Sequence, residues 1–255
     1  MHNKELRLTR ADGRANDEMR PVKILRHFQR YPDGSVLIEF GATRVACAAT
    51  AENAVPRFLK GTGTGWIAAE YSLLPSSTKE RTPRESVHGR QSGRTQEIQR
   101  LIGRCLRSIT DLKALGERTI HIDCDVLQAD GGTRTAAITG AFVALTEACA
   151  TFYQPGGVFP VKDFLAAVSV GLAESGEELL DLCYAEDSAA IADINVVMTG
   201  EGNFVEVQGT GEKQPFSREK FNHLLALAEK GIDELISLQK DALGGQLVWK
   251  VGRIG

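Results

Sequence analysis

The sequence predicts an α+β fold in which two groups of strands, each followed by a helix, pack around one core. Composition sets the scale: 42% of the 255 side chains are hydrophobic and 25% are charged, so the chain can bury a substantial core. Runs typical of β-strands occupy both halves, and each group of runs ends in a segment with helical periodicity. This order favours an α+β sandwich over a doubly wound parallel sheet.

The first half of the chain contains four predicted strands. Residues 36–40 and 44–50 flank Gly41 and predict a hairpin, and residues 66–71 predict a further strand. Residues 119–127 alternate most regularly, with apolar side chains on one face and His121, Asp123 and Asp125 on the other. One face of this strand is therefore expected to be buried.

Two helices are expected in the same half. Residues 75–93 form a polar, basic segment long enough to predict a mobile functional loop. Apolar residues then recur at helical spacing from Ile98 to Ile109, while Arg100, Arg104 and Arg107 share another face. Residues 137–149 predict a second, more apolar helix. The first helix is thus amphipathic with a basic stripe.

The second half predicts two hairpins and a last helix. Strands over 166–172 and 179–184 flank one turn, and strands over 192–199 and 204–208 flank another. Ser217 is a suitable N-cap for a helix that is apolar on one face through Ile236.

Charge is unevenly distributed along a chain whose net charge is −3. Residues 79–107 carry eight Lys and Arg against three carboxylates, whereas residues 174–212 carry ten carboxylates and no Lys or Arg. Two interpretations stay open. The segments pair with each other across an interface, or a polyanion site lies beside a metal or acid site.

The five cysteines and five histidines do not predict a metal centre. There is no Cys-x-x-Cys pair and the histidines are scattered, so we expect reduced core cysteines and no structural zinc. No apolar run approaches the roughly 18 residues of a membrane span, and the amino terminus lacks the apolar stretch of a signal peptide. We expect a soluble cytoplasmic protein without membrane contact.

The segment Gly131-Gly132-Thr133-Arg134 lies where the regular strand passes into a helix. Unpaired backbone N–H groups and the positive end of the helix dipole favour an oxyanion there, and glycine lets it approach the backbone. Thr133 adds a hydroxyl, and Arg134 can donate two parallel hydrogen bonds to phosphate. An ordinary glycine turn with a surface arginine is the alternative. Arg94, at the head of the basic helix, is a second candidate ligand unless it is simply solvated.

Asp187 and Asp193 are the candidate carboxylates of the acidic segment, six residues apart. Such a pair can share a magnesium ion or act as the acid for a leaving 3′ oxygen, although loop aspartates are more often just solvated. The glycine-rich run 61–65 precedes a strand and lacks a Gly-Lys-Ser/Thr ending, which argues against a nucleotide-binding loop.

Several longer motifs, in this order, resemble the ribonuclease PH family over about residues 12–242. They are Arg20-Pro21-Val22, Gly34-Ser35-Val36-Leu37, Val55-Pro56-Arg57-Phe58-Leu59-Lys60-Gly61, Gly65-Trp66, Ala69-Glu70-Tyr71, Glu97-Ile98-Gln99-Arg100-Leu101-Ile102-Gly103-Arg104, Asp123-Cys124-Asp125-Val126-Leu127-Gln128-Ala129-Asp130-Gly131-Gly132-Thr133-Arg134-Thr135 and Glu186-Asp187-Ser188-Ala189-Ala190. Residues 1–11 form an N-terminal extension. Residues 243–255 form a C-terminal tail that we expect to be disordered or to contact a partner. Ser76 stands where relatives carry arginine, so the loop lacks one of their positive charges.

The resemblance implies a fold, an activity and an assembly. The fold is a single compact domain of two βαβ-type halves, a sandwich like that of ribosomal protein S5 domain 2. The activity is that of a tRNA nucleotidyltransferase: phosphorolytic 3′→5′ trimming of tRNA precursors and other RNA 3′ ends, with inorganic phosphate as co-substrate and Mg²⁺ as cofactor. The assembly is a homohexamer built as a trimer of dimers.

The resemblance also implies residue roles. The residues expected to bind phosphate are Arg94, Gly132, Thr133 and Arg134. The expected catalytic residues are Asp187, Asp193 and Arg134, and the two aspartates are also the expected metal ligands. The residues expected to bind RNA are Arg81, Arg84, Arg100 and Arg104. The alternatives are a non-catalytic RNA-binding ring subunit, a hydrolytic ribonuclease and a small-molecule kinase. The hydrolase would need a denser carboxylate cluster for two metals than this sequence shows.

Overall fold

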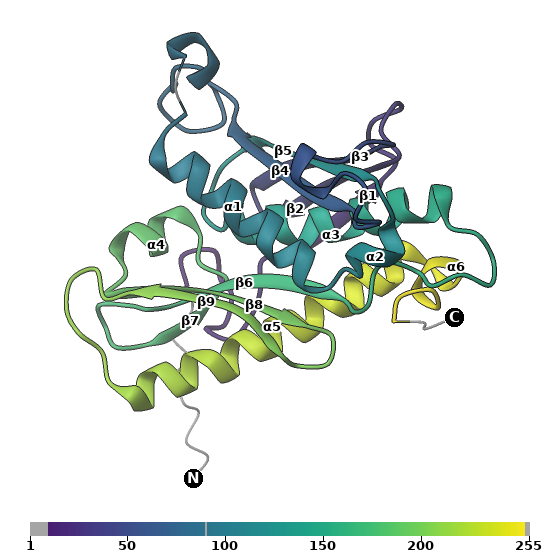
Figure 1. Cartoon of the computed structure of the whole chain (residues 1–255). Coiled ribbons are helices and arrows are strands. Elements are labelled where there is room, and N and C mark those ends of the chain that lie inside the picture. The colour runs from purple at the N-terminus through teal and green to yellow at the C-terminus, as the bar shows by residue number, and fades with distance from the viewer. Residues whose placement is uncertain (1–9, 90, 253–255) are drawn as a thin grey trace.

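The computed structural model describes residues 10–89 and 91–252, which form two sheets with helices between and beside them (Figure 1). The larger sheet has the order β1-β2-β3-β5-β4. Its strands are β1 (Val22–Arg26), β2 (Gly34–Phe40), β3 (Thr43–Glu52), β4 (Trp66–Leu73) and β5 (Thr119–Gln128). The predicted hairpin is confirmed, with Phe40 of β2 paired to Thr43 of β3.

β4 and β5 pair in parallel, and the chain between them forms a crossover. This crossover contains α1 (Gly93–Ser108) and the short α2 (Leu112–Leu115), so β4-α1-β5 is a βαβ unit. The 3₁₀ helices Arg57–Leu59 and Glu85–His88 lie in the loops before β4 and before α1. The other strand pairs of the larger sheet are antiparallel.

The smaller sheet is antiparallel, with the order β7-β6-β8-β9. Its strands are β6 (Leu165–Leu172), β7 (Glu178–Leu180), β8 (Ala192–Thr199) and β9 (Phe204–Thr210). The prediction of a strand over residues 179–184 was partly wrong. β7 ends at Leu180 because Asp181 takes a left-handed backbone (φ 53°), and residues Tyr184–Ala189 form the helix α4.

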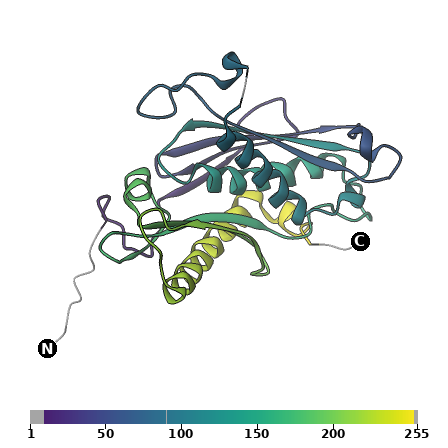
Figure 2. The ribbon, with the colours of Figure 1, turned by 60° about the vertical axis from the view of Figure 1, so that its left-hand side comes forward.

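The core lies on both sides of the smaller sheet. α3 (Thr133–Phe152) and α1 lie between the two sheets, and α5 (Arg218–Leu243) covers the far side of the smaller one (Figure 2). Every residue of β6 is buried, because α3 and α5 contact its two faces. α3 is long and apolar enough to cross a membrane, but 83% of its apolar window is buried inside the protein, as in a core helix.

The C-terminal part of the described chain confirms the predicted start of the last helix and differs from the prediction after it. Ser217 caps α5 as predicted, accepting a hydrogen bond from the Lys220 N–H. The C-terminal tail, expected to be disordered, is instead ordered from residue 243 to residue 252. After Gly244, α6 (Gly245–Val248) packs its apolar side chains on the core, and the Gly252 N–H donates to the Val161 carbonyl at 3.1 Å. Residues 253–255 lie outside the described residues.

The extension expected over 1–11 also joins the fold at its described end. Arg10 is buried and donates to the Leu180 and Asp181 carbonyls at 2.5 and 3.0 Å. Residues 1–9 lie outside the described residues. Four of the five cysteines are buried in the core, and Cys183 is half-buried before α4.

Candidate active site

A cavity of about 850 Å³ lies where the heads of α1, α3 and α4 meet β8 and β9. Six residues predicted from three distant parts of the sequence line it: Arg94, Gly132, Thr133, Arg134, Asp187 and Asp193. The fold thus brings together the phosphate ligands and the carboxylates that the sequence analysis proposed separately.

The glycine turn offers backbone donors to this cavity. Gly132 is the N-cap of α3 with φ 65°. The first N–H groups of a helix have no intrahelical partner, and here no side chain caps them either. Gly131 has φ 78°, and a Cβ there would lie 2.6 Å from the Leu182 carbonyl oxygen. Glycine is therefore needed at this position both for its conformation and for close packing.

The Thr133 hydroxyl is oriented by a residue that the sequence analysis did not select. The buried Tyr71 hydroxyl donates to Thr133 Oγ1 at 2.8 Å. Burial raises the pKa of Tyr71, so the phenol stays protonated and remains a donor. Because the Thr133 oxygen accepts this bond, its own hydrogen is left to donate to an anion.

Arg134 is held at the cavity wall by two partners. Its Nη1 donates to Gln208 Oε1 at 2.6 Å and lies 3.6 Å from Glu97 Oε1, while Gln208 Nε2 donates to the same Glu97 oxygen at 2.6 Å. Gln208 and Glu97 come from β9 and α1, and no local sequence signal pairs them. Arg94, the second residue of α1, is exposed at the mouth of the same cavity.

Asp187 and Asp193 form a half-buried acidic pair. Burial raises the pKa of each carboxyl, and for Asp193 the negative charges of Asp187 and Glu212 add to the increase. Arg94 and Arg134 act in the opposite direction on the pKa of Asp187. The pair therefore carries excess negative charge that a proton or a cation would offset.

The predicted RNA-binding arginines do not gather in this cavity. Arg81, Arg84 and Arg100 are exposed, on the loop before α1 and on α1 itself. Arg104 forms an ion pair with Glu206 of β9 at 2.7 Å. Arg104 therefore has a partner in the acidic segment, as in the interpretation that pairs the two segments, and its role in RNA binding stays a prediction.

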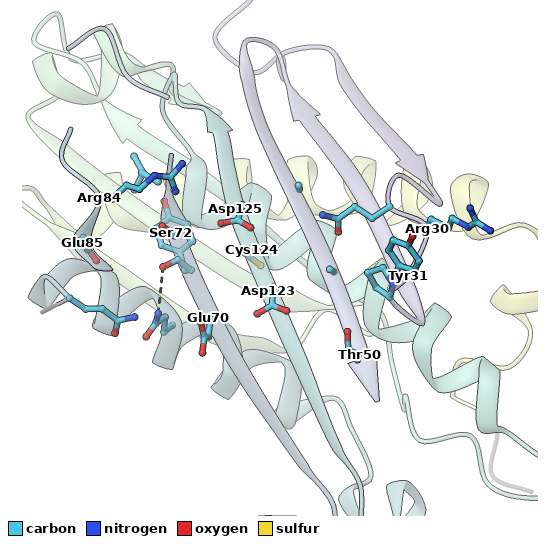
Figure 3. A pocket seen from close by; sticks show the side chains of 18 residues that line it. Arg30, Tyr31, Thr50, Glu70, Ser72, Arg84, Glu85, Asp123, Cys124 and Asp125 are labelled. Carbon is cyan, nitrogen blue, oxygen red and sulfur yellow. Dashed lines mark hydrogen bonds between the residues drawn. The ribbon is translucent and has the colours of Figure 1, made fainter. Parts of the chain in front are cut away.

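Arg84 borders a second cavity of about 730 Å³ on the open face of the larger sheet (Figure 3). Asp123 and Asp125 project from β5 and Glu70 from β4, with Arg30 and Tyr31 at the opposite rim. Burial and Glu70 raise the pKa of Asp123, while Arg84 counteracts the increase in the pKa of Asp125. This cavity shares Leu73 with the first but lies on another face.

Comparison with known proteins identifies the family. Sequence models of the 3′ exoribonuclease family match residues 18–150 (domain 1) and 163–231 (domain 2). Over 239 residues, 93% of the chain, it is 63% identical to a protein named Ribonuclease PH from Moorella thermoacetica, covering 95% of that protein. It is 61% identical, over an equal share, to the one from Syntrophomonas wolfei, covering 100% of it.

The fold also matches solved structures. A chain of the Archaeoglobus fulgidus exosome with RNA bound to the active site superposes with a TM-score of 0.77 at 22% identity, covering 91% of this chain and 93% of that one. This likeness concerns the fold alone. On the two matched family domains and the extent of its identity to named relatives, the chain belongs to the 3′ exoribonuclease family, as a ribonuclease PH.

Proposed function

We propose that the cavity beside the glycine turn is where this enzyme uses inorganic phosphate to remove nucleotides from the 3′ ends of tRNA precursors and other RNAs. One observation carries the assignment. The start of α3 with Thr133, two arginines and a carboxylate pair all line one cavity. Membership of the 3′ exoribonuclease family supports the same reaction class.

In this mechanism the bound phosphate is the nucleophile. An oxygen of the phosphate held by Gly132, Thr133, Arg134 and Arg94 attacks the phosphorus of the last phosphodiester. The bond to the 3′ oxygen breaks and a nucleoside diphosphate leaves. The two phosphate groups repel each other, and the arginines and helix-end amides offset this repulsion while fixing the geometry. Because a phosphodiester is exchanged for a phosphoanhydride, the reaction is reversible.

The departing 3′ oxygen needs a proton, and the carboxylate pair is suited to supply it. A carboxyl whose pKa is raised by burial holds its proton closer to neutral pH than an exposed one. Asp187 and Asp193 also fit a magnesium ion, which binds one or two carboxylates and takes its other ligands from water and phosphate. Among residues 10–89 and 91–252 no three His, Cys, Asp or Glu side chains form a denser metal cluster. When bound, the ion would supply positive charge to the reacting phosphates.

We further propose that the protein assembles as a homohexamer of three dimers. Similarity to ribonuclease PH supports this assembly. The open face of the larger sheet is consistent with a subunit contact, since its exposed Asp123 and Asp125 both have a raised pKa. Arg81 and Arg84, exposed on the loop before α1, are proposed to contact RNA, together with Arg100. A cytoplasmic location stays a prediction.

The site assignment is tested by separating turnover from RNA binding. We expect Arg134→Ala and Asp187→Asn each to abolish nucleotide release while RNA affinity, measured by fluorescence anisotropy, is retained. Arg44→Ala and Asp241→Asn are the controls, because both residues are exposed and lie outside the cavity. Full turnover in either cavity variant would contradict the assignment. Loss of RNA binding by Asp187→Asn would instead indicate a structural role.

A further inference from the structure

Three arginines near the amino terminus are buried around Asp181 and do not line the active-site cavity. Arg10, Arg14 and Arg20 are 8%, 6% and 4% exposed, and all three approach Asp181, which is fully buried. Arginine is rarely buried to this extent unless its charge and donors are paired. The burial of these three arginines around one aspartate therefore indicates that they do more than keep the surface soluble.

Arg20 contacts both the glycine turn and Asp181, the residue that follows β7. Its Nε and Nη2 donate to the two carboxylate oxygens of Asp181 at 2.9 and 2.7 Å. Its Nη1 donates to the Asp130 carbonyl at 2.6 Å, and Nη2 lies 3.5 Å from the Gly131 carbonyl. One guanidinium thus joins the glycine turn to the segment that follows β7.

The carbonyl contacts decide where the amides of the turn point. Thr43 Oγ1 donates to the Gly131 carbonyl at 2.7 Å and accepts from the Asp130 N–H at 2.9 Å, so two side chains hold the turn from this side. In a trans peptide the C=O and the following N–H point in opposite directions. Fixing the Gly131 carbonyl toward Thr43 and Arg20 therefore directs the Gly132 N–H away from them, to the side of the phosphate seat.

The same network holds the helix that carries Asp187. The Asp181 carbonyl accepts from Arg10 and Arg14, and Arg10 also binds Glu186 in the first turn of α4. A Cβ on Gly131 would meet backbone atoms of residues 182–184, so the turn and the start of α4 are in direct contact.

We propose that Arg20, through Asp181 and the carbonyls of the glycine turn, is a positioning residue that sets the phosphate seat relative to the carboxylate pair. This inference rests on the proposed phosphate site. Arg20 itself does not line the cavity. Its loss should weaken the use of phosphate while leaving RNA binding, which involves other surfaces, nearly unchanged.

The chain offers a matched control. Arg26 also binds one carboxylate, that of Glu147, and donates to two carbonyls, of Ala242 and Leu243 at 3.0 and 3.1 Å. Its carboxylate partner lies near the end of α3 and its carbonyl partners at the end of α5, all outside the cavity. Arg20→Lys and Arg26→Lys therefore each remove a guanidinium that binds one carboxylate and two carbonyls. The Arg26 side chain is the more exposed, 24% against 4%, and only Arg20 adjoins the glycine turn.

The test measures the KM for inorganic phosphate and the KM for 3′-labelled RNA, with melting temperatures for every variant. We expect Arg20→Lys to raise the phosphate KM roughly tenfold and to change the RNA KM less than about twofold, since a misplaced seat penalises the reactant it orients. Thr43→Val removes a contact to the glycine turn without leaving an unpaired charge in the core. It should also raise the phosphate KM, by less than Arg20→Lys does. Arg26→Lys should change neither KM.

Two results would overturn the inference alone: an unchanged phosphate KM in Arg20→Lys and Thr43→Val, or an equal increase in Arg26→Lys. The unsubstituted protein is assayed first. If its nucleotide release did not depend on phosphate, both this inference and the proposed function would fail.

Discussion

Replacing Gly131 by alanine should damage stability and phosphate use together. The residue has φ 78°, and an added Cβ would lie 2.6, 2.7 and 2.8 Å from backbone atoms of Leu182, Cys183 and Tyr184. Because these atoms belong to the backbone, no side-chain rotation can relieve the contact. The turn must therefore move away from the start of α4, and the phosphate seat must move with it.

The expected decrease in the free energy of unfolding has two parts. A non-glycine residue in the left-handed region costs about 1–2 kcal/mol. Overpacking against fixed neighbours adds about 1–3 kcal/mol. Gly176→Ala isolates the first part, since Gly176 has φ 88° in the β6–β7 turn and an added Cβ there would have no neighbour within 4 Å.

Urea unfolding at a fixed protein concentration, followed by tryptophan fluorescence, gives the free energies of unfolding, and phosphate titration of RNA trimming gives the KM. We expect Gly131→Ala to be less stable than Gly176→Ala and to be the only one of the two with a raised phosphate KM. Equal losses of stability in the two variants, with normal phosphate kinetics in both, would refute the close packing of the turn against α4.

Three further outcomes follow from individual contacts. Tyr71→Phe should lower the free energy of unfolding by about 1 kcal/mol and raise the phosphate KM several-fold, because Thr133 loses the donor that orients it; an unchanged KM would contradict the orienting role of Tyr71. Asp123→Asn should raise the urea midpoint at pH 7. A raised carboxyl pKa means that the fold disfavours the charged form, so the gain should shrink as the pH falls through the raised pKa toward the unfolded value. A loss at pH 7 would indicate that the carboxylate has a partner in the assembly. Arg100→Gln should weaken RNA binding more than Arg104→Gln and reduce its salt dependence, because Glu206 already neutralises Arg104; the reverse order in anisotropy titrations would contradict this.

Elements with a strong local pattern were predictable from the sequence. The alternation over 119–127 gave β5 and its exposed Asp123 and Asp125, and Ser217 gave the start of α5. The glycine turn was also found, because strand, paired glycines and helix are contiguous in the chain. Its residues line the cavity together with Arg94, Asp187 and Asp193.

What the sequence did not predict depends on contacts between distant segments. The strand expected over 179–184 stops at Leu180, where the buried carboxylate of Asp181 meets Arg20, a residue 161 positions away. Likewise, Arg104 matched a free basic stripe by spacing, yet Glu206 lies opposite it in the fold. Local periodicity shows which face a side chain occupies and gives no information about what faces it.

The identity of the nucleotide released from 3′-labelled RNA, with and without inorganic phosphate, shows whether phosphate or water is the nucleophile. The phosphate seat predicts that a nucleoside diphosphate appears only when phosphate is present, and that added diphosphates lengthen the RNA when phosphate is removed. Release of a nucleoside monophosphate without phosphate would mean that water is the nucleophile. No release under either condition would mean that the chain binds RNA without cleaving it, and either result would contradict phosphorolysis at this site.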